Sequence, residues 1–201
     1  MTEPLLTTRL RERAAQALGD RFLHEALDIA TTKFITLRRD TYRHEDGDEV
    51  EREVVSHPGA VGVVVLDGDR LWFVRQPREA VGVPDLLEIP AGKLDEDGES
   101  PLETARRELA EEIGKQAEGW EDLGSFYTSV GFTDEEVHLF LASGISDVDE
   151  RPKAAEDERI DVESRPLSDL DAIIADAKDS KTLIGLLKLK ARLATGGGAR
   201  H

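Results

Sequence analysis

Short stretches in which apolar and polar residues alternate recur through the middle of the chain, and this pattern predicts β-strands. Residues 33–43 and 50–55 are two such stretches separated by a polar turn, so they predict a β-hairpin. Residues 60–66 are almost wholly apolar and predict a buried strand, which a short turn joins to a further strand at residues 71–74. Residues 86–89 are a brief apolar segment that ends at Pro90, and three more strands are expected, at residues 123–127, 136–142 and 160–166.

Apolar residues at helical intervals predict three further segments, residues 5–30, 101–113 and 168–193. The middle helix has the clearest ends, because Ser100 is a suitable N-cap, Pro101 favours the first turn and Gly114 favours termination. The glycine-rich tail, residues 196–201, is expected to be disordered because it offers little to pack. Strands in the middle and helices at both ends indicate an α+β fold rather than alternating βαβ units.

The charge of the chain narrows the possible partners. Acidic residues outnumber basic ones by 43 to 26, and the formal net charge is −17. This excess argues against a partner that is nucleic acid or anionic lipid, since both are bound through basic surfaces. The chain has no cysteine, which excludes disulfides, thiol nucleophiles and cysteine-bound metals. Neither a signal peptide nor an apolar run of about 18 residues is evident, so we expect a soluble, cytoplasmic protein.

Three glutamates cluster on the predicted helix 101–113. Glu108, Glu111 and Glu112 are three and four residues apart, so they share one helix face. Like charges held together destabilise a helix, whereas a hard divalent cation binds both carboxylates and phosphate oxygens. A solvated acidic face is the alternative interpretation. The spacing of the residues around the glutamates favours a metal site, through which an acidic protein can act on an anionic substrate.

The segment that precedes this helix supports the same interpretation. Gly92 and Gly98 flank a loop whose backbone can fold against the helix and offer a carbonyl group to a metal. Arg107 is expected to face away from the three glutamates and to pair with Glu99 or Glu103, which would fix the loop to the helix.

Residues 92–114 resemble the signature of the Nudix hydrolases: glycine, a spacer, glutamate, seven residues, and then Arg-Glu-aliphatic-any-Glu-Glu-any-Gly. Two departures leave every ligand in place: six residues instead of five separate Gly92 from Glu99, and Lys115 replaces an aliphatic residue. The resemblance implies the Nudix fold, an α+β arrangement with a mixed β-sheet sandwiched between helices. It also implies hydrolysis of a nucleoside diphosphate linked to another moiety.

Outside the signature, residues 33–193 are similar to the ADP-ribose pyrophosphatase subgroup. The segments that carry the similarity are residues 52–61, 75–78, 87–92 and 129–135. Val130 stands where the subgroup usually has a proline linked to ADP-ribose preference. The likeness implies hydrolysis of ADP-ribose to AMP and ribose 5-phosphate with Mg²⁺, or Mn²⁺, as cofactor. Hydrolysis of another nucleotide sugar or an oxidised nucleotide is one alternative, and a non-catalytic nucleotide-binding module is another.

The subgroup resemblance also implies a domain organisation. Residues 1–55 are expected to form an N-terminal helix and β-hairpin extension that contributes to a homodimer contact. Residues 56–195 are expected to form the Nudix hydrolase domain, ahead of the tail at 196–201. The small-molecule substrate and a second copy of the chain are the only partners expected.

The metal ligands expected from the residues and the resemblance are Glu108, Glu111, Glu112 and the carbonyl of Ala91. Hydrolysis also needs a general base that takes a proton from water. The resemblance places this base in the loop 129–135, and we assign it to Glu135. The neighbouring Glu136 and the helix glutamates Glu111 and Glu112 are the alternatives.

Substrate contacts are expected from two arginines and one further glutamate. Arg52 and Arg78 are candidates for holding the diphosphate, because a guanidinium group matches phosphate oxygens at two points. Glu88 is expected either to orient substrate or metal or to be a salt-bridge partner. The histidines show no metal-ligand spacing and are interpreted as structural or exposed: His24, His44, His57, His138 and His201.

Overall fold

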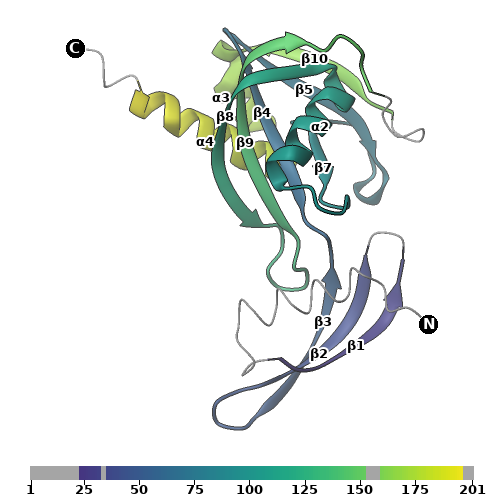
Figure 1. The fold of residues 1–201 in the computed structure, drawn as a ribbon. Coiled ribbons are helices and arrows are strands. Elements are labelled where there is room, and N and C mark those ends of the chain that lie inside the picture. Colours follow the sequence, from purple (N-terminus) through teal and green to yellow (C-terminus); the bar gives the residue numbers. More distant parts are fainter. Residues whose placement is uncertain (1–22, 33–34, 153–158, 197–201) are drawn as a thin grey trace. The chain divides into compact units, whose positions relative to one another are not determined.

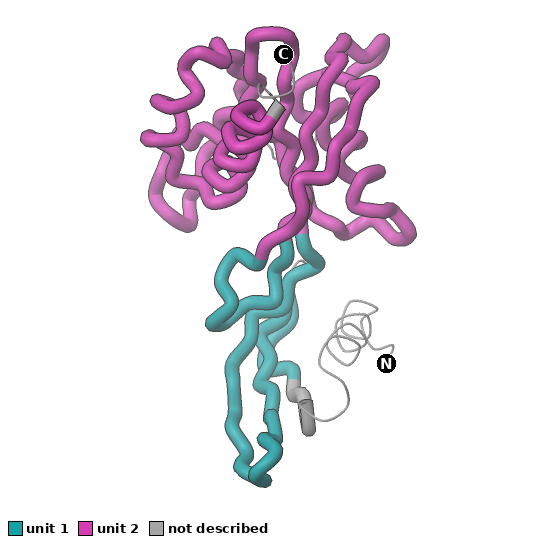
Figure 2. The backbone as a smooth tube through the Cα atoms, turned by 90° about the vertical axis from the view of Figure 1, so that its left-hand side faces the viewer, with its two compact units in different colours: residues 1–59, 127–136 teal, residues 60–126, 137–201 magenta. Residues whose placement is uncertain are grey.

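The computed structural model describes residues 23–32, 35–152 and 159–196 of the chain (Figure 1). These residues belong to two compact units (Figure 2). The first unit combines residues 1–59 with residues 127–136, and the second combines residues 60–126 with residues 137–201.

The first unit is built on an antiparallel sheet with the strand order β1-β2-β3. Its strands are β1 (Leu23–Thr31), β2 (Thr36–Arg43) and β3 (Glu49–Ser56). Strands β2 and β3 confirm the predicted hairpin over its described residues, with Asp40 opposite Arg52 in the register. A long polar turn joins them, in which the N–H of His44 donates to the carbonyl of Asp48 at 2.8 Å.

Strand β1 corrects the prediction of a helix over residues 5–30. Residues 23–30 are extended and pair along their length with β2, from Leu23 opposite Tyr42 to Thr31 opposite Thr36. The spacing of apolar residues there suits a helix, but the backbone hydrogen bonds to β2 favour the strand. Residues 5–22 of the predicted helix lie outside the described residues.

The second unit contains a seven-stranded sheet. Five strands follow the order β10-β5-β4-β9-β8, while β6 pairs with β5 and β7 pairs with β4. The strands are β4 (Ala60–Asp67), β5 (Arg70–Arg78), β6 (Val83–Glu88), β7 (Ala91–Lys93), β8 (Lys115–Tyr127), β9 (Glu136–Asp147) and β10 (Asp161–Pro166). The pairing of β4 with β9 is parallel and those with β5 and β7 are antiparallel, so the sheet is mixed.

Helices cover both faces of this sheet: α2 (Pro101–Ile113) on one, and α3 (Leu170–Asp176) and α4 (Ser180–Gly196) on the other (Figure 1). Alternate side chains of β4 and β9 point to opposite faces and build two apolar clusters. The cluster under α2 contains Val61, Val63, Val65, Val74, Ala105, Leu109, Ile113, Phe140 and Ala142. The cluster under α3 and α4 contains Val64, Leu71, Phe73, Ile89, Val137, Leu139, Leu141, Leu170, Ile173, Leu186 and Leu189. The predicted sheet between helices is confirmed.

The predicted limits of the elements hold best at α2. Its N-terminus is a capping box, in which Ser100 Oγ accepts the N–H of Glu103 and the Glu103 carboxylate accepts the N–H of Ser100. Gly114 ends the helix with a left-handed φ of 67°. Short 3₁₀ turns, Glu79–Val81 and Leu167–Asp169, also occur.

The C-terminal region differs from the prediction in two respects. The helical segment expected at 168–193 is divided into α3 and α4, because Ala177 has an extended backbone conformation. Gly196, which was expected in the disordered tail, is the last residue of α4, and residues 197–201 lie outside the described residues. No helix within the described ranges is long and apolar enough to cross a membrane.

Candidate active site

The C-terminal half of α2 carries the three clustered glutamates. Leu109 and Ile113 are buried in the apolar cluster of the sheet, and they fix the rotation of the helix. Glu112, which lies between them in sequence, is itself buried. The same spacing that produces the apolar stripe therefore sets where Glu108, Glu111 and Glu112 project.

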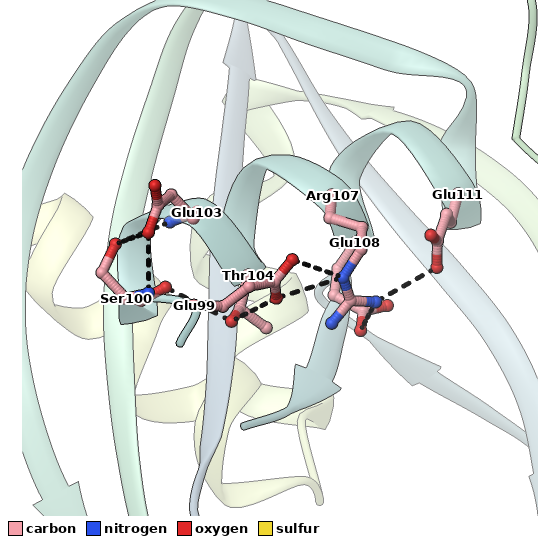
Figure 3. Close-up of polar contacts among 7 residues, drawn as sticks. All are labelled: Glu99, Ser100, Glu103, Thr104, Arg107, Glu108 and Glu111. Atoms are coloured by element: carbon pink, nitrogen blue, oxygen red, sulfur yellow. Dashed lines mark hydrogen bonds and ion pairs between the residues drawn. The ribbon is translucent and has the colours of Figure 1, made fainter. Parts of the chain in front are cut away.

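Arg107 lies at the centre of an ion-pair network on α2 (Figure 3). Its Nε donates to both carboxylate oxygens of Glu99 at 3.2 Å, and its Nη1 donates to Glu108 at 2.8 Å and to Glu111 at 3.3 Å. Burial acts to lower the pKa of Arg107, but the charges of Glu108, Glu99 and Glu111 raise it above its usual value.

This network confirms one prediction and corrects another. The expected pairing of Arg107 with Glu99 is present, whereas Glu103 belongs to the capping box. The expectation that Arg107 faces away from the clustered glutamates is wrong, because its guanidinium bridges Glu108 and Glu111. A single cation thereby offsets part of the repulsion among the carboxylates.

Strand β7 brings backbone atoms close to the same glutamates. The N–H of Ala91 donates to Glu112 Oε2 at 2.9 Å. A Cβ on Gly92 would lie 2.0 Å from the carboxyl carbon and from Oε1 of Glu108, so the absence of a side chain permits this approach. Because Gly92 has no side chain, β7 can lie this close to the Glu108 carboxylate without displacing it.

The residues gathered here fit a hard divalent cation in their chemistry. The donors are carboxylate oxygens of Glu108, Glu111 and Glu112 and the backbone of Ala91, which are the ligand types that Mg²⁺ and Mn²⁺ prefer. Over the described ranges, no three histidine, aspartate or glutamate side chains already converge as a metal-ligand group. Arg107 instead holds two of the glutamates, so a bound cation would share their charge with Arg107.

A second charged cluster surrounds the fully buried Glu88 at the end of β6. Arg78 donates from Nε to Glu88 Oε1 at 2.6 Å and from Nη2 to Oε2 at 2.8 Å. Lys181 also donates to Glu88 and pairs with Asp179 at 3.0 Å. Burial acts to raise the pKa of Glu88, but hydrogen bonds and charges of Arg78 and Lys181 lower it below its usual value. Glu88 is thus a salt-bridge partner in this structure.

The remaining predicted site residues belong to the first unit. Glu135 ends a loop in which Thr128 Oγ1 donates to Glu135 Oε2 at 2.7 Å, and His57 Nδ1 lies 3.5 Å from Glu135 Oε1. Glu136 is the first residue of β9. Arg52 is exposed on β3, and its Nη1 donates to the carbonyl of Glu51 at 2.8 Å.

The family model described as NUDIX domain matches residues 56–186, a span that contains the whole glutamate signature on α2 and the sheet around it. The chain belongs to the Nudix family. Membership confirms the predicted resemblance, and the mixed sheet between helices agrees with the fold that the resemblance implied. The chain is therefore a Nudix hydrolase, as the sequence predicted.

Three curated proteins illustrate the place of this Nudix chain among its relatives. It is 38% identical over 169 residues to the ADP-ribose pyrophosphatase of Bacillus subtilis (strain 168), and the aligned residues cover 83% of this chain and 90% of that protein. The methanol dehydrogenase activator of Bacillus methanolicus is equally similar, at 38% identity over 169 residues, with the same coverage of 83% and 90%. The ADP-ribose pyrophosphatase of Mycobacterium tuberculosis is 45% identical over 131 residues, covering 65% of this chain and 62% of that protein.

A solved structure described as an ADP compounds hydrolase has a similar fold. The TM-score is 0.75 at 20% sequence identity, and the match covers 89% of this chain and 96% of the other. At this identity the likeness concerns the fold.

Two residues that contact the Nudix site were not found from the sequence. Arg151 donates from Nε to the carbonyl of Glu111 at 3.0 Å and also to the carbonyl of Glu112, from a polar loop with no recognisable pattern. Lys181 stands in the first turn of α4, where the helix dipole disfavours a cation. That unfavourable position was the one available sign that a carboxylate lies nearby.

Proposed function

We propose that the chain hydrolyses ADP-ribose to AMP and ribose 5-phosphate with Mg²⁺ or Mn²⁺ as the cofactor. The observation that carries the proposal is the set of oxygen donors on α2 and β7, in a chain 38% identical to an ADP-ribose pyrophosphatase over 169 residues. A binding module without catalysis would have no need to keep three carboxylates on one helix face, since their repulsion costs stability.

In this proposal Glu108, Glu111, Glu112 and the Ala91 carbonyl hold the cation. A bound divalent cation neutralises charge on the diphosphate and lowers the pKa of a coordinated water. Gly92 leaves room for the Glu108 carboxylate, and the Ala91 N–H orients Glu112. These contacts set the ligands in place before substrate arrives, which is how a site avoids reorganisation during the reaction.

The chemical step is attack of water on one phosphorus of the diphosphate. A new P–O bond forms, and the bond between the attacked phosphorus and the bridging oxygen breaks, so that this oxygen leaves with its electron pair on the other phosphate. Glu135 accepts the proton that the water loses. Thr128 holds one oxygen of the Glu135 carboxylate through a hydrogen bond of 2.7 Å. This contact orients the carboxylate while the other oxygen serves as the proton acceptor.

Two arginines are proposed to bind the diphosphate. The two-point pairing of Arg78 with the buried Glu88 fixes its guanidinium, so little side-chain entropy remains to be lost on binding. Arg52, the second candidate, is exposed on β3. Glu88 acts by orienting Arg78.

The test is hydrolysis of a panel of diphosphates with Mg²⁺, read as kcat/KM. The panel contains ADP-ribose, GDP-mannose, a second nucleotide sugar and an oxidised nucleoside triphosphate. We expect ADP-ribose to have the highest kcat/KM and to yield AMP and ribose 5-phosphate. Inactivity toward every compound contradicts the hydrolase function. A higher kcat/KM for another nucleotide sugar contradicts only the assignment of ADP-ribose as the preferred substrate.

We also propose that residues 1–55 contribute to a homodimer and that residues 56–195 form the hydrolase domain. Ile29 and Ile35 support the dimer, because 46% and 39% of these apolar residues are exposed. Light scattering coupled to gel filtration tests it: a mass of one chain at micromolar concentration contradicts the dimer. The cytoplasmic location stays a prediction.

A further inference from the structure

Strand β2 carries a buried pair of opposite charges in the first unit. Asp40 is fully buried and Arg38 is only 9% exposed. Nε of Arg38 donates to the two carboxylate oxygens of Asp40 at 2.9 and 2.8 Å, and the Tyr42 hydroxyl donates to Asp40 at 3.1 Å. Removing charges from water is costly, and a buried pair offsets this cost only when its geometry is good and further hydrogen bonds satisfy its remaining polar atoms.

The contacts of this pair extend to Asp134, the residue before Glu135. Arg38 Nη1 lies 3.1 Å from Asp134 Oδ2. Ser56 connects the same two groups, since its Oγ accepts from Arg38 and donates to Asp134 Oδ2 at 2.8 Å. The backbone N–H of His57 donates to Asp134 Oδ1 at 2.8 Å. Both oxygens of Asp134 are therefore held.

Backbone hydrogen bonds attach the same loop to the end of β3. The N–H of Val55 donates to the carbonyl of Phe132 at 2.7 Å, and the N–H of Asp134 donates to the carbonyl of Val55 at 3.4 Å. Val55 and Thr133 form an isolated parallel bridge. The segment directly before Glu135 is thus fixed by main-chain and side-chain contacts at once.

The convergence on Asp134 exceeds what charge balance requires. Both carboxylate oxygens of Asp40 already accept the Nε–H of Arg38, so a second carboxylate is not needed to neutralise the guanidinium. Asp134 nevertheless accepts hydrogen bonds from three donors, provided by Arg38, Ser56 and the His57 backbone. Three donors on one carboxylate determine both the position and the rotation of the residue that carries it.

We propose that Arg38, Asp40 and Ser56 form a clamp that positions Glu135 by holding Asp134. The clamp residues are positioning residues, and the proposal rests on the proposed role of Glu135 as general base. A proton acceptor works only within hydrogen-bond reach of its water, and a displacement of about 1 Å can lower the rate about 100-fold. The clamp thereby couples the N-terminal sheet to the rate of the chemical step.

The test measures kcat and KM for ADP-ribose in two clamp variants, which are substitutions that weaken the contact between the clamp and Asp134. Asp134→Asn replaces one acceptor oxygen by a donor, and Ser56→Ala removes the bridge between Arg38 and Asp134. We expect kcat to fall about 10- to 100-fold with KM changed less than about 3-fold. Arg39→Met is the matched control, because Arg39 is the exposed neighbour of Arg38 and pairs with Glu53 at the surface. Its kcat should stay within about 2-fold of the wild-type value.

A second measurement separates positioning from a general structural effect. In a Glu135→Gln background the base is already lost, so adding Asp134→Asn should lower kcat by less than about 3-fold. A clamp variant with wild-type kcat overturns the proposal, and so does a loss of the same size in both backgrounds. If Asp134→Asn does not fold by circular dichroism, Ser56→Ala in the same two backgrounds decides the question.

The same experiment distinguishes failure of the clamp from failure of the function. Wild-type hydrolysis of ADP-ribose tests the activity itself. A Glu135→Gln variant with wild-type kcat overturns the base assignment and the clamp while the activity stands. A defective Glu135→Gln variant beside active Asp134→Asn and Ser56→Ala variants overturns the clamp alone.

Discussion

Gly92 lies against Glu108 so closely that a Cβ at position 92 would be 2.0 Å from the carboxyl carbon of Glu108. A carboxylate at the end of a flexible side chain can move away from such a clash, so the fold tolerates a methyl group there. The carboxylate that moves is a proposed metal ligand. A methyl group at position 92 should therefore weaken metal binding and catalysis more than it lowers the free energy of unfolding.

We predict that Gly92→Ala lowers kcat/KM for ADP-ribose about 100-fold and raises the Mg²⁺ concentration needed for half-maximal activity. The matched control is Gly119→Ala, whose Cβ would lie 2.6 Å from Ser143 Oγ on the neighbouring strand. This variant is crowded by a flexible side chain in the same way but should keep its activity. Equal kcat/KM values for the two variants would argue against a ligand role for Glu108.

Arg151 binds the C-terminal end of α2 through the carbonyls of Glu111 and Glu112. A cation at this end of a helix is favoured by the helix dipole, and its hydrogen bonds satisfy carbonyls that have no partner within the helix. We predict that Arg151→Ala lowers the free energy of unfolding by about 1 kcal/mol and raises the Mg²⁺ requirement. Urea denaturation and a Mg²⁺ titration of activity measure the two effects.

Arg151→Lys serves as the comparison for this prediction. It keeps the charge near the helix end but cannot bind two carbonyls with a planar group. Its stability should lie between those of the wild type and Arg151→Ala. If both variants match the wild type in stability and in Mg²⁺ requirement, Arg151 does not support the glutamate helix.

Glu88 should make stability depend on pH. The pKa of Glu88 is lower in the folded chain than in the unfolded chain, so its carboxylate contributes fully to the free energy of unfolding above about pH 4.3. This contribution is lost as the pH falls through the lowered folded pKa. Glu88→Gln should lower the free energy of unfolding by about 2 kcal/mol at pH 7, because Arg78 and Lys181 lose their charged partner.

Urea denaturation at pH 7 and at pH 3.5 checks this prediction, since the difference between wild type and Glu88→Gln should shrink at the lower pH. Glu53→Gln is the control, because Glu53 pairs with Arg39 on the exposed surface. It should change the free energy of unfolding by less than about 0.5 kcal/mol at either pH. A cost for Glu88→Gln that is the same at both pH values would contradict the role assigned to its charge.

Helix α2 and the glutamate site were predictable from the sequence because their signals are local. The capping box of Ser100 and Glu103, together with Gly114, determines where the helix begins and ends. The spacing of Glu108, Glu111 and Glu112 then follows from helical geometry alone. Short-range chemistry of this kind can be recognised without knowing what packs against the helix.

The features that could not be predicted from the sequence depend mostly on partners that are distant along the chain. Residues 23–30 have helical spacing, but β2 beside them provides a backbone ladder that favours a strand. The clamp joins Arg38 to Asp134 across 96 positions, and no local pattern indicates that these two residues pair. Arg107 and Glu111 are four residues apart on one helix face, so helical spacing alone could have predicted their contact. The contact with the adjacent Glu108 could not be predicted in that way, because it depends on the reach of a long guanidinium side chain.

The central claim is that the carboxylates of α2 hold a divalent cation that hydrolysis requires. The most direct test is the Mg²⁺ dependence of ADP-ribose hydrolysis by the wild type and by Glu112→Gln, after removal of metal with EDTA. We predict that Mg²⁺ restores the wild-type activity and that Glu112→Gln has a kcat/KM at least about 100-fold lower at saturating Mg²⁺. Wild-type activity that persists without metal, or an equally active Glu112→Gln variant, would contradict the claim.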